Sequence, residues 1–293
     1  MSHLEGIVLY KARVLLSAHS MKKTIISSVN LFVGLAILSG CTISNEARDK
    51  LEGQCLPGVV GGSVTAKSDP LSKKVVMLIG SRYNEKGEEE SSVCTGTPIT
   101  EDVILTAAHC VKGNVRMAAV FANDMNCSSG FRASRDSIVA SSFEYDHSFV
   151  ESYSGFYNDV GLVRLKSKIP SDYVISELYA GAELSSDDVT LVGFGKTSES
   201  KSDSMTLRSK TKSFKNDITV SSDRVTIEQS EGGLCQGDSG GPIFVEVNGE
   251  KQVIGVTSYV SNRYESNICH GKAVGMLSTS ILPWIAKTLP TLK

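Results

Sequence analysis

The sequence has almost no net charge and few aromatic residues. Its 293 residues hold 30 Lys and Arg against 32 Asp and Glu, and only 6% are Phe, Trp or Tyr. No basic stripe with interleaved aromatic side chains occurs, so a nucleic-acid partner is not expected. The sequence also lacks a repeat with a period of 20–50 residues, which argues against solenoids and propellers. With 41% hydrophobic residues, the chain can bury one large core or two small ones.

The N-terminus resembles an export signal rather than a folded segment. From Met21 the chain has a basic start at Lys22 and Lys23, an apolar stretch to Leu38, and small residues before Cys41. The apolar core of about ten residues is shorter than the ~20 that a membrane-spanning helix needs. The string that ends at Cys41 resembles a bacterial lipobox, in which the cysteine is lipidated and becomes the new N-terminus. An ordinary signal peptide with a free cysteine is the alternative.

These features divide the chain into three parts. Residues 1–40 contain the signal, with the first 20 interpreted as an over-called start, and residues 41–58 form a tether or pro-segment. Residues 59–293 form the folded domain. We expect an exported protein that touches the membrane only through its lipid, at the outer membrane facing the periplasm or the cell surface, or released from it.

The cysteine count fits an exported protein. Seven cysteines are an odd number, and lipidation of Cys41 would account for one of them. The other six could form three disulfides in an oxidising compartment; they are Cys55, Cys94, Cys110, Cys127, Cys235 and Cys269. The sequence alone permits fifteen pairings.

Short β-type runs broken by Gly, Ser, Asn and Asp fill the region from Val59 onward. The clearest are 75–80, 103–106, 160–165, 189–193, 224–228 and 253–259. Such a pattern predicts an all-β barrel or sandwich. One helix is expected at 278–287, with Pro283 near its start, where proline is tolerated.

The string Gly237-Asp238-Ser239-Gly240-Gly241-Pro242 is suited to a nucleophilic serine. Such a serine needs a tight turn with backbone N–H groups facing the attacked carbonyl, and glycines permit that turn. Gly-Ser strings also occur in flexible linkers. The adjacent Asp238 and the apolar run after Pro242 argue against a linker.

A serine nucleophile needs a base, and three histidines follow the signal segment. His109 ends an apolar strand and lies beside Cys110, which favours it. His147 lies in a polar stretch and is interpreted as a surface residue, whereas His270 could line the rim of a pocket. A buried carboxylate must then orient the imidazole. Asp159, at the head of an apolar strand, suits that role, although an Asp there could also be a turn residue.

Together, the strings around His109, Asp159 and Ser239 resemble the three signature motifs of the trypsin/chymotrypsin family, in that family's order. With Val59-Val60-Gly61-Gly62 at the front, the resemblance covers residues 59–293. It implies two antiparallel six-stranded β-barrels at about 59–168 and 169–280, followed by the C-terminal helix.

The resemblance also implies roles for single residues. His109 would be the general base and acid, Asp159 its orienter and Ser239 the nucleophile. The N–H groups of Gly237 and Ser239 would form the oxyanion hole, and the backbone near Ser258 would pair with an extended substrate.

Further implied features concern disulfides and activation. The resemblance pairs Cys94 with Cys110 and Cys235 with Cys269, which by elimination leaves Cys55 with Cys127. Cleavage before Val59 would create an ammonium group that pairs with Asp238. Gly58 precedes this bond instead of the basic residue common in family zymogens.

The specificity pocket would comprise Ser258, Gly233 at its base, Val260 on one wall and Ala273 on the far side. Without a carboxylate at the base, cleavage after small or medium apolar residues is expected. A distant acid such as Glu265 could instead supply a charge.

The expected function is a monomeric serine endopeptidase that acts on proteins or peptides without a metal or cofactor. One alternative is a zymogen-like or catalytically silent binding protein at the surface, because a basic residue before Val59 is missing. Another is an esterase, but the α/β-hydrolase order of Ser, Asp and His differs from the order here.

Overall fold

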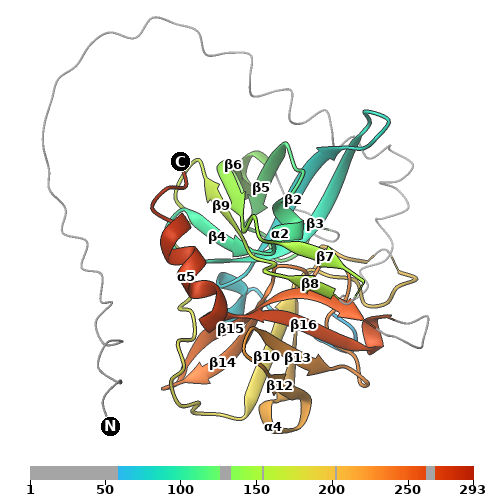
Figure 1. The fold of residues 1–293 in the computed structure, drawn as a ribbon, viewed down its shortest axis with the longest axis vertical. Coiled ribbons are helices and arrows are strands. Elements are labelled where there is room, and N and C mark those ends of the chain that lie inside the picture. Colours follow the sequence, from blue (N-terminus) through green and yellow to red (C-terminus); the bar gives the residue numbers. More distant parts are fainter. Residues whose placement is uncertain (1–58, 126–132, 154, 202, 262–267) are drawn as a thin grey trace, which may run out of the picture. The chain divides into compact units, whose positions relative to one another are not determined.

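The computed structural model describes residues 59–125, 133–153, 155–201, 203–261 and 268–293 (Figure 1). These residues form two large β-sheets, a separate two-stranded sheet and a few short helices. Within them, no helix is both long and apolar enough to cross a membrane. The expected lipid attachment at Cys41 and the expected Cys55–Cys127 pair lie outside the described residues.

The first sheet is a closed six-stranded barrel with the order β2-β3-β4-β9-β6-β5. Its strands are β2 (Val76–Tyr83), β3 (Glu89–Pro98), β4 (Val103–Thr106), β5 (Arg116–Val120), β6 (Ser137–Tyr145) and β9 (Gly161–Leu165). Val76 and Leu78 of β2 point into the barrel core. Met77, between them, packs with Phe194 and Phe244 in a second core. Alternate residues of one strand therefore serve both the barrel and its contact with the second sheet.

The second sheet has eight strands in the order β1-β11-β10-β14-β15-β16-β13-β12. They are β1 (Ser63–Val64), β10 (Asp188–Gly193), β11 (Arg208–Ser213), β12 (Ile218–Val220), β13 (Arg224–Glu228), β14 (Pro242–Val247), β15 (Glu250–Ser261) and β16 (Lys272–Leu277). The run β11-β10-β14-β15-β16-β13 repeats the connectivity of β3-β2-β5-β6-β9-β4 in the barrel. The two halves of the domain thus share one topology.

One of the two expected closed barrels is present as such. In the second half, β11 pairs with β1 and β13 pairs with β12, so the two edges that would close a six-stranded barrel have other partners. The result is a curled eight-stranded sheet. Residues 59–64, expected in the first barrel, therefore belong with this second sheet, and the Val60 N–H donates to the Gly233 carbonyl at 2.9 Å.

The remaining elements lie around these sheets. They are the hairpin β7 (Val150–Ser152) and β8 (Gly155–Tyr157), helices α2 (Ala108–Val111), α3 (Ala133–Asp136), α4 (Phe214–Asp217) and α5 (Ser278–Thr288), and two 3-10 turns, Pro70–Lys73 and Ile268–His270. In α5, Ile281 and Ile285 are one turn apart and buried. Pro283 is the sixth residue of α5 rather than near its start, so its missing N–H falls where a helical hydrogen bond would form.

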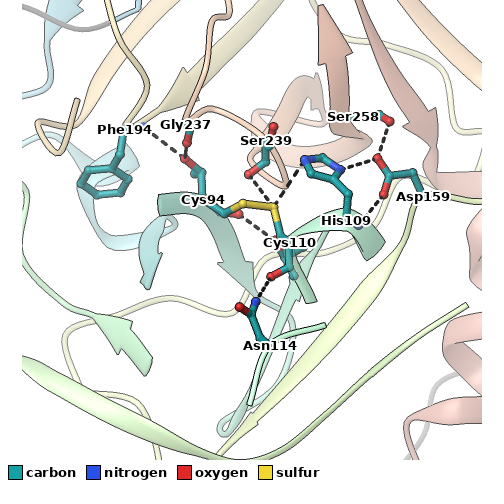
Figure 2. The surroundings of a disulfide bond; sticks show 11 residues. Cys94, His109, Cys110, Asn114, Asp159, Phe194, Gly237, Ser239 and Ser258 are labelled. Carbon is teal, nitrogen blue, oxygen red and sulfur yellow. Dashed lines mark hydrogen bonds and ion pairs between the residues drawn. A yellow bond between two sulfur atoms is a disulfide. The ribbon is translucent and has the colours of Figure 1, made fainter. Parts of the chain in front are cut away.

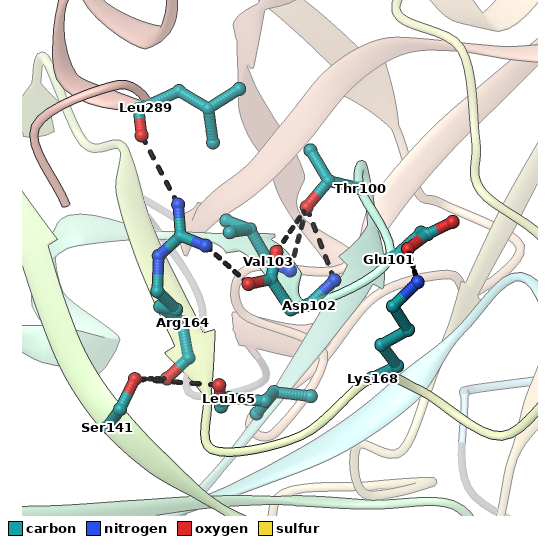
Figure 3. A network of polar contacts seen from close by, with 9 residues as sticks. All are labelled: Thr100, Glu101, Asp102, Val103, Ser141, Arg164, Leu165, Lys168 and Leu289. Atoms are coloured by element: carbon teal, nitrogen blue, oxygen red, sulfur yellow. Dashed lines mark hydrogen bonds and ion pairs between the residues drawn. The ribbon is translucent and has the colours of Figure 1, made fainter. Parts of the chain in front are cut away.

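Polar contacts tie the end of α5 to the first barrel (Figure 3). Arg164 on β9 pairs with Asp102 and donates from Nη2 to the Leu289 carbonyl at 3.4 Å. Thr100 accepts the Val103 N–H at 3.0 Å and thereby shapes the turn that carries Asp102. The C-terminal helix is thus fixed at its end, while its apolar face packs on β4 and β16 residues.

Candidate active site

His109 and Asp159 meet because the strands that carry them are paired. His109 lies in α2, directly after β4, and Asp159 directly precedes β9. Thr106 at the end of β4 pairs with Gly161 at the start of β9. His109 Nδ1 lies 2.8 Å from Asp159 Oδ2, and the His109 backbone N–H donates to Oδ1 at 2.9 Å. Two hydrogen bonds therefore fix the imidazole against one carboxylate.

Asp159 is fully buried, and a third hydrogen bond reaches it from the second sheet. Ser258, at an irregularity of β15, donates its hydroxyl to Asp159 Oδ2 (Figure 2). In the tautomer with its proton on Nδ1, the His109 ring donates to this carboxylate. Nε2 is then left with a lone pair that can accept a proton. From the sequence, Ser258 was expected in the specificity pocket with its backbone offered to the substrate; its side-chain contact with Asp159 was not predicted.

Ser239 lies in the tight turn before β14. Gly237 and Gly240 have φ angles of +99° and +79°, a region that favours glycine. The Cys110 Sγ atom lies 3.7 Å from His109 Nε2 and 3.6 Å from the Ser239 carbonyl oxygen, so one sulfur contacts both residues. Among the described residues there is no hydrogen bond from Ser239 Oγ to His109 Nε2. Such bonds are often long without substrate and shorten in the complex.

Thr95, a fully buried residue of β3, holds the serine turn from the first barrel. Its hydroxyl donates to the Gly237 carbonyl at 2.8 Å, and its N–H donates to the Ser239 carbonyl at 2.8 Å. The Phe194 N–H donates to the same hydroxyl at 3.1 Å. The N–H groups of Gly237 and Ser239 donate to no other described residue. Both N–H groups are thus without an acceptor among the described residues. Sequence reasoning did not identify Thr95.

Asp238 is a buried acid beneath this turn. Its carboxylate accepts the Gly195 N–H at 2.7 Å and the Cys235 N–H at 2.8 Å. Burial raises its pKa to about 7, although these hydrogen bonds and the Arg208 charge act in the opposite direction. Val59 is also fully buried and has a φ angle of +54°, which is strained for a β-branched residue.

Comparison with known proteins identifies the family. The Trypsin family model matches residues 68–285. This chain belongs to the trypsin family.

Relatives of this trypsin-family chain are named as proteases. It is 26% identical over 227 residues to phenoloxidase-activating enzyme 1 of Spodoptera litura, covering 69% of the chain and 59% of that relative. It is 26% identical over 251 residues to serine protease SP24D of Anopheles gambiae, covering 79% and 81%. Chymotrypsin-like elastase family member 1 of Macaca fascicularis is 28% identical over 252 residues, covering 79% and 89%. The fold also matches the structure of HL collagenase at 20% identity, with a TM-score of 0.60, covering 79% of the chain and 99% of that structure.

The residues expected around the specificity pocket of this trypsin-family chain lie on neighbouring segments. Val260 on β15 is directly opposite Ala273 on β16. Both belong to one apolar cluster with Leu234, which follows Gly233. Gly233, Leu234 and Ala273 are buried, and Val260 is partly buried. Val260 and Ala273 therefore belong to one apolar cluster, and Gly233 adjoins it through Leu234.

The cysteine pairs implied by the resemblance are present. Cys94 is bonded to Cys110 and Cys235 to Cys269, with Cα atoms 6.2 and 4.9 Å apart. Cys94, His109 and Cys110 cluster closely, but the two sulfurs form a disulfide and cannot act as thiolate ligands for a metal.

The other two candidate histidines have different surroundings. His147 is exposed and lies 3.1 Å from Glu144, while His270 Nδ1 lies 3.5 Å from the Ser230 carbonyl.

An aromatic group that the sequence did not indicate borders His109. The Phe156 ring of β8 lies 5.4 Å from the imidazole, centroid to centroid, and 5.5 Å from the Tyr259 ring. The Arg224 guanidinium lies 4.1 Å above the Tyr157 ring. The hairpin β7–β8 is therefore joined to β13 and β15, on the side of the site that carries Ser258. Only the positions of these residues in space, not their sequence spacing, reveal this group.

Proposed function

We propose that this trypsin-family chain is an active serine endopeptidase with His109, Asp159 and Ser239 as its triad. The observation that carries the proposal is the buried Asp159 carboxylate, which binds both the ring and the backbone of His109 and accepts the Ser258 hydroxyl. A buried carboxylate in this position fixes the tautomer and stabilises the imidazolium that forms during reaction.

The reaction would follow from these positions. Ser239 Oγ attacks the peptide carbonyl while His109 Nε2 takes its proton. The N–H groups of Gly237 and Ser239, left without other described acceptors, bind the oxyanion. His109 then gives the proton to the leaving amine, and an acyl-enzyme remains on Ser239. Water, activated by His109, hydrolyses this ester and restores the enzyme.

The second candidate is a zymogen-like or silent binding protein on the same fold. It would explain why Gly58 precedes Val59. A silent protein has no need for a buried, triply hydrogen-bonded Asp159, and this feature is present here. The endopeptidase is therefore the better-supported function.

The proposed substrates have a small or medium apolar residue on the acyl side of the cleaved bond, such as Ala, Val, Thr or Leu. Gly233 brings no charge, and Val260 and Ala273 are apolar. A buried Lys or Arg without a partner would lose several kcal/mol of solvation. Glu265, which could supply a charge, lies outside the described residues. Because a fitting methylene is worth ~1–3 kcal/mol, the preference should be graded.

A peptide-library cleavage profile tests both the reaction and this preference. We expect cleavage after Ala, Val, Thr and Leu, and its loss in the Ser239→Ala protein. A dominant preference for Arg or Lys would contradict the proposed pocket while leaving the triad intact. No cleavage of any peptide by a chain that begins at Val59 would contradict the peptidase.

We also propose that the protein is exported and anchored through lipid on Cys41, with the lipobox-like string as support. Cys41→Ala should move the protein from the membrane fraction to the soluble fraction or block its processing. Incorporation of labelled palmitate that is unchanged in Cys41→Ala would exclude this anchor. Cys55→Ala serves as the matched control and should incorporate palmitate normally.

A further inference from the structure

Gln229 is fully buried one residue beyond β13, and its carboxamide is held on three sides. Oε1 accepts the Leu234 N–H at 2.5 Å. Nε2 donates to the Leu234 carbonyl at 3.1 Å and to the Cys269 carbonyl at 3.5 Å. Both hydrogens of Nε2 therefore have backbone acceptors, and one lone pair of Oε1 remains. The orientation of this amide is fixed by the backbone around it.

This carboxamide occupies the space in front of Gly233. A Cβ atom built on Gly233 would lie 2.3 Å from Gln229 Oε1 and 2.8 Å from Gln229 Cδ. A side chain at position 233 would start in the volume that the amide fills. Because Gly233 is the position expected at the base of the specificity pocket, the amide of Gln229 lies where a base side chain would otherwise lie.

We propose that the Gln229 carboxamide is the floor of the specificity pocket and limits the substrate residue there to small, uncharged side chains; this proposal rests on the proposed peptidase function. The amide carries no net charge, so it cannot compensate a desolvated Lys or Arg. It has no free donor, so it cannot bind Asp or Glu either. The volume of the amide makes the pocket shallower at its Gly233 end. The neighbouring Cys235–Cys269 disulfide holds together the two chain segments that contain these cysteines.

The first test compares cleavage profiles of Gln229→Ala and wild type, both in the mature form. Removing the amide should deepen the pocket, so the ratio of kcat/KM for Leu and Met over Ala should rise at least ~10-fold. Gln252→Ala is the matched control, because Gln252 donates to Glu177 at the surface and should leave the profile unchanged. An unchanged profile in Gln229→Ala would overturn the proposal.

Labelling by a small fluorophosphonate separates this proposal from the peptidase itself. Wild type and the surface control Gln252→Ala should react at the same rate, and Ser239→Ala should not react. Absence of labelling in wild type would refute the peptidase. Normal labelling and cleavage by wild type with an unshifted Gln229→Ala profile would refute only the role of Gln229.

A second test does not depend on activity. If Gln229 and a side chain at 233 compete for one space, Gly233→Ala should lower the Tm of the wild-type background. The same substitution should have a much smaller effect in the Gln229→Ala background. Equal losses in both backgrounds would show that the amide does not occupy this space.

Discussion

Ser239→Ala and His109→Ala should each lower kcat for a peptide substrate by about 10⁶-fold, because members of a triad act as a unit. Without Ser239 no acyl-enzyme forms, and without His109 nothing removes the proton from Ser239 Oγ. The double variant should be little worse than either single one. Asp159→Asn should cost about 10⁴-fold, since the amide would favour the wrong tautomer of His109.

Single-turnover assays on purified variants measure these losses. His147→Ala is the matched control, because His147 is exposed and contacts the neighbouring Glu144 and Tyr145 at the end of β6. It should keep full activity. Retention of a tenth or more of the wild-type rate by His109→Ala would assign the base to another residue.

A chain that begins at Val59 should be more active than one that begins at Gly58, by a factor on the order of 10²–10³, the effect of losing one oxyanion donor. The free ammonium of Val59 would neutralise buried Asp238, which carries Gly237 and Ser239 on either side of it. Cleavage also removes the strained φ torsion of Val59, because that torsion exists only while Gly58 is attached. Asp238→Asn should lower the activity of the Val59 form to that of the Gly58 form. Equal activities of the two forms would contradict this activation.

The uncleaved chain should also lose stability as the pH rises. An aspartate in the unfolded chain titrates near 3.9, whereas Asp238 in the folded chain keeps its proton up to about 7. Between these values the folded state binds more protons, so the free energy of unfolding falls with pH, by about 4 kcal/mol in total. Urea titrations between pH 4 and 8 should show this loss in the uncleaved chain and not in its Asp238→Asn variant.

Sequence patterning predicted most of the β-structure but not how the second half closes. The expected strands 103–106 and 224–228 match β4 and β13 residue for residue, because each is a compact β-branched run with clear ends. β1 pairs with β11, which lies more than 100 residues further along the chain. β12, which pairs with β13, is a short strand at the edge of the sheet. Such pairings leave no periodic signal in the sequence.

In the candidate active site, too, some residues could be predicted from the sequence and others could not. The strings around His109, Asp159 and Ser239 stand out because catalysis restricts glycines and neighbours locally. Thr95 and Gln229 act through several hydrogen bonds to backbone groups outside their own strands, so neither belongs to a recognisable string. Their positions become meaningful only when the strands β3 and β13 are placed beside the serine turn.

The most direct measurement is mass spectrometric mapping of the protein after reaction with a fluorophosphonate. We predict one adduct, on the peptide that contains Ser239, absent in Ser239→Ala and formed far more slowly in His109→Ala. Undiminished labelling of the Ser239→Ala protein, or an adduct on another serine, would contradict the assignment of Ser239 as the nucleophile.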